Sequence, residues 1–190
     1  MSGLIEMYHG GSNWEGAAEI QPPRAKRYEY GPGIYFTTRY ETAKKYAKGR
    51  GVVKRFWIKA PLRSIDSVKI SADEALLFIA GLERMKNSQK VLDDIRRYAD
   101  RVKQMLIPLS VVNNLCVNHD AVPGAPGVKL AMWFTSHGAQ AEINRMGNES
   151  WLVLFNPLLV TRSDVVSSKN VKDWDLPLLS VRDGMIVQER

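Results

Sequence analysis

The stretch GPGIYFTT, residues 31 to 38, places a Gly-Pro-Gly sequence directly before an aromatic and β-branched run. Proline fixes its own φ angle and glycine adopts backbone conformations that other residues avoid, so this sequence predicts a tight corner. Residues 34 to 38 are of the types that favour strands. We therefore expect a corner that leads into a β-strand and carries Tyr35 close to its start.

A second pair of glycines follows the segment that we expect to be the first strand, residues 3 to 9. His9 ends that strand, and Gly10 and Gly11 form a corner after it. Glycines at the end of a strand let a ligand lie against bare backbone, whose N–H and C=O groups pair with a planar amide. An aromatic ring such as Tyr35 offers a face on which a flat ring stacks, and His9 can hydrogen-bond a hydroxyl. Together the two corners suit a nucleoside-like ligand that carries a carboxamide.

These residues resemble the diphtheria-toxin-like ADP-ribosyltransferases, a family that includes the poly(ADP-ribose) polymerases and many bacterial and phage enzymes. The family's His-Tyr-Glu motif has a histidine and a glycine at the end of the first strand, then a tyrosine in a G-x-Y-F-type strand. A second aromatic residue follows eleven positions later, and a glutamate begins a late strand. His9, Tyr35 and Tyr46 match the first three features in order and spacing, and NESWLVLFNP, residues 148 to 157, is similar to the glutamate segment. The resemblance covers residues 5 to 62 and 128 to 166.

The late glutamate has two candidates. In the family it often stands closer to the proline of a strand-end Asn-Pro than Glu149 does here, eight residues before Pro157. A six-residue spacing places Trp151 at that position. Residues two apart on a strand share a face, so Glu149 can still point into the same site. We choose Glu149, and the alternative is Glu142, on the facing arm of the expected hairpin.

The resemblance implies that NAD loses nicotinamide through a cation-like sugar and that ADP-ribose passes to a macromolecular acceptor. Gly10 would hold the carboxamide, and Tyr35 and Tyr46 would sandwich the nicotinamide ring. His9 would bind the adenosine ribose. Glu149 would bond the 2′-hydroxyl of the nicotinamide ribose and stabilise the positive charge at the anomeric carbon. The predicted catalytic residues are therefore Glu149, His9 and Tyr35.

Basic residues on the long loop before the Gly-Pro-Gly corner are candidates for binding the pyrophosphate of NAD. They are Arg24, Lys26 and Arg27, and ordinary exposed loop charge explains them equally well. The chain carries a net charge of +7 at pH 7, from 27 Lys and Arg against 20 Asp and Glu. That charge indicates an anionic partner, and the acceptor is expected to be a protein or a nucleic acid. The resemblance implies no metal.

Residues 1 to 190 are expected to form a single domain. Ser71 and Glu74 form a capping box, and apolar residues repeat at helical intervals as far as Leu106, which predicts a helical insertion over about residues 71 to 107. Strands on both sides of this helical middle indicate an α+β fold. The resemblance implies split mixed or antiparallel sheets around an NAD cleft.

The cysteine count and the pattern of apolar residues indicate the cellular compartment of the protein. The one cysteine, Cys116, lies in an apolar segment and cannot form an internal disulfide, so we expect a buried hydrophobic side chain and a reducing environment. No apolar stretch reaches the length of a membrane span, about 18 residues. The N-terminus has neither the basic start nor the apolar run of a signal peptide. We expect a cytoplasmic protein with no membrane partner.

Three alternatives remain open. An NAD-dependent RNA 2′-phosphotransferase shares the fold class, but the Arg-His pairs expected there are not evident. Plain NAD hydrolysis would use water as the acceptor. A non-catalytic basic module that binds nucleic acid or protein would keep the fold and lack the glutamate. A carboxylate within hydrogen-bonding distance of the ribose position opposite Tyr35 would separate the enzymes from the binding module.

Overall fold

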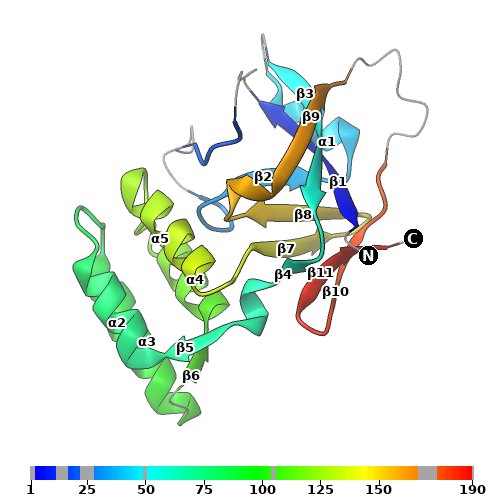
Figure 1. Cartoon of the computed structure of the whole chain (residues 1–190). Coiled ribbons are helices and arrows are strands. Elements are labelled where there is room, and N and C mark those ends of the chain that lie inside the picture. Colours follow the sequence, from blue (N-terminus) through cyan, green and yellow to red (C-terminus); the bar gives the residue numbers. More distant parts are fainter. Residues whose placement is uncertain are drawn as a thin grey trace.

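A computed structural model of the protein describes residues 3–11, 17–21, 28–48, 51–103, 106–166 and 175–189. Its main layer is a six-stranded antiparallel sheet with the strand order β7-β8-β2-β1-β3-β9, drawn in Figure 1. The strands are β1 (Leu4–Gly11), β2 (Ile34–Thr37), β3 (Val52–Lys59), β7 (Ala141–Met146), β8 (Glu149–Leu154) and β9 (Val160–Val165).

The remaining elements lie on the two faces of this sheet and beside it. A three-stranded sheet has the order β10-β11-β4, and β5 pairs with β6. Four helices, α2 to α5, gather on one side of the molecule, whereas α1 lies beside β1 (Figure 1). The α+β expectation is confirmed. The bounds are α1 (Tyr40–Tyr46), α2 (Ala72–Gly81), α3 (Ser88–Val102), α4 (Leu109–Asn118), α5 (Ala125–Ser136), β4 (Leu62–Arg63), β5 (Lys69–Ser71), β6 (Leu106–Pro108), β10 (Leu179–Arg182) and β11 (Met185–Gln188), with 3-10 turns at Ile65–Ser67 and Pro157–Leu159.

The helical middle lies between β5 and β6, whose pairing brings Ser71 opposite Leu106. The expected cap forms, because the Ser71 hydroxyl accepts a 3.1 Å hydrogen bond from the backbone N–H of Glu74. The apolar stripe ends earlier than the sequence predicts. Helix α3 stops at Val102, because Lys103 takes a left-handed conformation with φ of 48°, and Leu106 lies on β6 and is 51% exposed.

Apolar side chains cover both faces of the six-stranded sheet. On one face the helices α2 to α5 pack over the end of β8, at Val153 and Phe155, and Cys116 of α4 is buried there as expected. On the other face the small sheet β10-β11-β4 covers the inward side chains of β1, β2 and β3. A third, smaller cluster fixes α1 to β1 through Tyr8, Tyr40, Ala43 and Val53.

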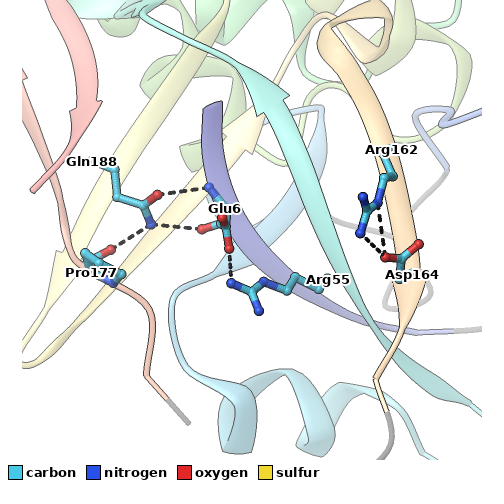
Figure 2. Close-up of polar contacts among 6 residues, drawn as sticks. All are labelled: Glu6, Arg55, Arg162, Asp164, Pro177 and Gln188. Carbon is cyan, nitrogen blue, oxygen red and sulfur yellow. Dashed lines mark hydrogen bonds and ion pairs between the residues drawn. The ribbon is translucent and has the colours of Figure 1, made fainter. Parts of the chain in front are cut away.

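A side-chain amide joins the last strand to the first, as Figure 2 shows. The Gln188 amide oxygen accepts from the backbone N–H of Glu6 at 2.9 Å, and its nitrogen donates to the Glu6 carbonyl at 2.9 Å. The same nitrogen donates to the carbonyl of Pro177 at 3.0 Å. The Glu6 carboxylate also accepts from Arg55 on β3. These contacts hold β11 against β1 and fix the position of the small sheet.

Among the described helices, none combines the length and the apolar character that crossing a membrane requires.

Candidate functional site around Glu149

The His-Gly-Gly sequence does not form the expected corner. Strand β1 continues through His9, Gly10 and Gly11, and all three pair with β3. A Cβ at Gly10 would lie 1.6 Å from the carbonyl oxygen of Ala43 on α1. Because no side chain fits in that space, Gly10 allows α1 to pack directly on β1. The prediction of a corner is therefore wrong, and the glycine instead sets the position of α1.

His9 joins β1 to β2. Its Nδ1 lies 2.7 Å from the backbone oxygen of Tyr35, and a carbonyl only accepts, so Nδ1–H is the donor. The ring packs edge-on against Phe36 and Phe56, with centroid distances of 5.9 and 6.0 Å. Burial lowers the pKa of His9, and the bond to Tyr35 opposes this only in part. The neutral imidazole therefore presents Nε2 as an acceptor.

Tyr35 braces the Gly-Pro-Gly corner with its own hydroxyl. The hydroxyl donates to the carbonyl of Gly31 at 2.6 Å and accepts from the backbone N–H of Tyr30 at 3.1 Å. Gly31 has a φ of 109°, and a Cβ there would lie 2.2 Å from the Asn113 side-chain oxygen. Burial raises the pKa of Tyr35. The corner that the sequence predicts is present, and its shape depends on Tyr35 and on Asn113.

His9 and Tyr35 are neighbours, yet their side chains lie on opposite faces of the sheet. The His9 ring contacts Phe36, and side chains alternate along a strand, so Tyr35 points the other way. Tyr35 packs against the helical core. His9 and Tyr35 thus meet through the backbone oxygen of Tyr35, but their side chains do not line the same side of a binding site.

Glu149 stands at the start of β8, where its carboxylate accepts three side-chain hydrogen bonds. Oε2 accepts from the hydroxyl of Thr42 at 2.6 Å and from that of Thr37 at 3.3 Å. Oε1 accepts from the indole N–H of Trp151 at 2.7 Å. Strand β2, helix α1 and strand β8 therefore meet at this one carboxylate.

Tyr46 lies in the same cluster as Glu149. Its ring meets Trp151 edge-on at a centroid distance of 5.5 Å and an angle of 82°, and Trp151 also lies 6.2 Å from the ring of Tyr30. Burial raises the pKa of Tyr46, and the charges of Glu29, Tyr30 and Glu149 add to the effect. Tyr46 itself is 49% exposed, so a planar ligand can reach its ring. We call Tyr30, Tyr46, Glu149 and Trp151 the Glu149 cluster.

The sequence pattern presents Trp151 only as an alternative occupant of the glutamate position and does not indicate Tyr30. The signal for Trp151 is its place two residues after Glu149, because such residues share a strand face. Tyr30 has no comparable signal in the sequence, since its contact with Trp151 joins residues far apart along the chain.

Glu142 is separate from this cluster. On β7 it pairs with Val153, whereas Met146 pairs with Glu149, so the two carboxylates are four residue steps apart, about 13 Å along the strands. The Glu142 side chain is 8% exposed and accepts a 2.7 Å hydrogen bond from Asn113. Burial raises its pKa to about 7, and the charge of Asp66 adds to the shift.

Asn113 links Glu142 to the Gly-Pro-Gly corner. The amide nitrogen that binds Glu142 also donates to the backbone oxygen of Tyr30 at 2.9 Å. This carboxyl group therefore supports the corner from inside the protein. The predicted pyrophosphate ligands Arg24, Lys26 and Arg27 lie outside the described residues.

No family model matches the chain, and no curated protein matches it. Among solved structures, the chain is similar to one described as the crystal structure of an anti-CRISPR protein, with 15% sequence identity and a TM-score of 0.39. The match covers 86% of this chain and 96% of the other. A likeness at this level assigns neither a fold family nor a function.

Proposed function

We propose that the protein is an NAD-dependent ADP-ribosyltransferase, which releases nicotinamide and transfers ADP-ribose to a protein or nucleic-acid acceptor. The supporting observation is the set of contacts at Glu149. Its carboxylate accepts from Thr42, which lies one helical turn before Tyr46, and from Thr37, two residues after Tyr35. Two segments that resemble the family's motif thus meet at one carboxylate, although 107 and 112 residues separate the two threonines from Glu149.

Three residues of the Glu149 cluster, Tyr46, Trp151 and Glu149, have roles that their chemistry allows. The exposed face of Tyr46 offers a stacking surface for the nicotinamide ring, and Trp151 limits the movement of the Tyr46 ring. Glu149 supplies negative charge beside the anomeric carbon as the glycosidic bond to nicotinamide breaks. Gly10 lies on the neighbouring strand β1, whereas the His9 side chain lies on the other face of the sheet and packs against Phe36 and Phe56.

The hydrogen bonds of Glu149 also indicate how a ribose would enter. The bonds from Thr42 and Trp151, at 2.6 and 2.7 Å, are short, whereas the 3.3 Å bond from Thr37 is the longest of the three. Longer hydrogen bonds are weaker. A ribose 2′-hydroxyl would therefore replace the Thr37 donor and leave the other two in place.

A second candidate is a non-catalytic binding module on the same fold. Trp151 occupies the position that a six-residue spacing gives to the catalytic glutamate, and Glu149 already has three side-chain donors. A protein that had lost catalysis would have these features too. Its net charge of +7 would then serve to bind an anionic macromolecule.

The deciding experiment follows NAD labelled separately in its nicotinamide and in its adenosine part, incubated with the protein and a cell lysate. A transferase releases nicotinamide and leaves the adenosine label on protein or nucleic acid. Free labelled ADP-ribose with no labelled macromolecule identifies a glycohydrolase. The absence of nicotinamide release in every lysate fraction identifies the binding module and rules out the enzyme.

A further inference from the structure

Strand β9 forms one end of the six-stranded sheet, where Figure 1 shows it beside β3. Within the described parts of the chain, no strand pairs with its outer edge. Residues 161 to 165 are exposed, including Val165 at 59%. An exposed edge of this kind carries backbone donors and acceptors that can pair with another strand.

The hydrogen bonds to β3 determine which backbone groups of β9 point outward. The N–H of Val166 donates to the carbonyl of Val53 at 2.9 Å. In an antiparallel ladder, bonded pairs alternate with non-bonded pairs. Asp164, opposite Arg55, is therefore bonded to β3. The N–H and C=O groups of Ser163 and Val165 point to the open edge.

Two opposite charges flank Ser163. Arg162 and Asp164 project from the same face of β9, and the guanidinium donates to the Asp164 carboxylate at 2.6 and 3.1 Å (Figure 2). The guanidinium also lies 4.2 Å from the centre of the Trp57 ring, which restricts its position. Both side chains stay largely exposed, at 64% and 51%. The open edge of β9 thus carries a cation, Arg162, and an anion, Asp164. They lie on either side of Ser163, whose backbone groups point outward.

We propose that β9 pairs antiparallel with β9 of a second copy of this chain, with Ser163 opposite Ser163 of the second copy. In this register the outward backbone groups of the two serines bond each other. Arg162 lies opposite Asp164 of the second copy, and the reverse pair forms on the other side of the two-fold axis. The proposal is independent of the proposed enzymatic function.

The other registers fail for physical reasons. A shift by one residue sets Ser163 opposite Asp164, whose backbone groups already bond β3. A register centred on Arg162 or on Asp164 places two like charges directly opposite each other, which is destabilising. The Ser163-centred register is the one that both bonds outward backbone groups and places Arg162 opposite Asp164 of the second copy.

The expected dimer is weak. A single pair of strands buries less surface than a stable interface needs, so we expect a dissociation constant between about 10 µM and about 1 mM. Sedimentation velocity of the full chain up to about 1 mM should give a mass that rises from monomer to dimer. A monomer at every concentration would overturn the proposal.

Ser163→Pro tests the backbone bonds. Proline lacks the N–H group, and the N–H of Ser163 points away from β3, so the fold should tolerate it at an edge. We expect dimerisation at least about tenfold weaker, with the thermal unfolding of the monomer unchanged. If Ser163→Pro unfolds β9 instead, substitutions of Arg162 and Asp164 test the proposed dimer.

Those variants are Arg162→Asp and Asp164→Arg. The first presents two carboxylates at the edge and the second presents two cations, so each alone should be monomeric. Mixed together, the two variants should form a heterodimer, because positions 162 and 164 of one variant then face the opposite charge on positions 164 and 162 of the other. Arg97→Asp, the same charge change at an exposed site on α3, should dimerise like the native chain. Native-like dimerisation of either single variant, or a mixture that stays monomeric, would overturn the register.

Discussion

The hydroxyl of Thr42 donates a 2.6 Å hydrogen bond to the carboxylate of Glu149, which lies 107 residues later in the chain. Thr42 is on α1, one turn before Tyr46, and α1 is fixed to β1 where Gly10 leaves room for the Ala43 carbonyl. The orientation of Glu149 therefore depends on the packing of α1 as well as on β8. The contact between Thr42 and Glu149 and the contact between Gly10 and Ala43 can each be removed by a separate substitution.

Thr42→Val removes the donor and keeps the shape of the side chain. One hydrogen bond to a charged group contributes about 1.5 to 3 kcal/mol, so we expect NAD turnover to fall about tenfold or more while NAD affinity changes little. Turnover by nicotinamide release and affinity by calorimetry measure the two effects. Thr135→Val, on α5 and away from the cluster, is the matched control and should leave both unchanged.

Gly10→Ala tests the contact between β1 and α1. The added Cβ meets the backbone oxygen of Ala43 at 1.6 Å, so the helix must move. We expect the free energy of unfolding to fall by about 2 to 3 kcal/mol, as other overpacked sites do. Gly81→Ala, in α2 with no atom within 4 Å, is the control and should raise stability by up to about 1 kcal/mol. Equal urea unfolding curves for the two variants would contradict this account of Gly10.

The two glycines of the His-Gly-Gly sequence illustrate what a sequence can and cannot predict. The strand after the Gly-Pro-Gly corner and the cap at Ser71 follow from local chemistry, and the structure has both. Gly10 looks the same whether it ends a strand or continues one, because its reason lies in the distant Ala43. The opposite directions of His9 and Tyr35 likewise depend on how β1 and β2 pair, which residue types do not determine.

Asn113 is a second case that the sequence could not decide. It lies in a largely apolar segment, from which Leu109, Val112 and Cys116 pack into the core. Its partners are the backbone of Tyr30 and the carboxylate of Glu142. These contacts span 83 and 29 residues. The resemblance singles out Glu149 and Tyr46 as candidates, whereas the buried polar support of the Gly-Pro-Gly corner required the fold.

Glu142 should make stability depend on pH. Its pKa is raised from 4.5 to about 7 in the folded protein, so the folded state keeps a proton that the unfolded chain releases. The stability that this proton contributes is fully present below about pH 4.5 and is lost as the pH rises through about 7. In between, the free energy of unfolding falls by about 1.4 kcal/mol per pH unit. Relative to Glu142→Gln, the wild type should lose about 2 to 3 kcal/mol of unfolding free energy between pH 5 and pH 8. A difference that stays constant over this range would mean that Glu142 titrates normally.

The two tyrosines should respond differently to substitution. Tyr46→Ala removes a ring that is 49% exposed, so NAD binding should weaken by about 1 to 2 kcal/mol with little loss of stability. Tyr35→Phe keeps the ring and removes the hydroxyl that holds Gly31, so unfolding should become easier by about 1 to 2 kcal/mol. Calorimetry with NAD and urea unfolding of both variants separate the effects. If Tyr35→Phe instead weakens NAD binding and leaves stability intact, Tyr35 contacts the ligand directly.

Glu149→Gln separates an enzyme from a binding protein. The amide keeps the size of the side chain and can still accept from Thr42, but it lacks the charge that stabilises a developing sugar cation. We expect nicotinamide release to fall about 10²-fold or more while NAD affinity changes little, because the charge matters most in the transition state. Glu142→Gln is the matched control, since it makes the same change four residue steps away at a carboxyl group that contacts Asn113. Loss of turnover in Glu142→Gln alone, with the protein still folded, would move the catalytic role to that residue and leave the enzyme assignment standing. Equal turnover in both variants and in the wild type would mean that neither carboxylate takes part in the chemistry.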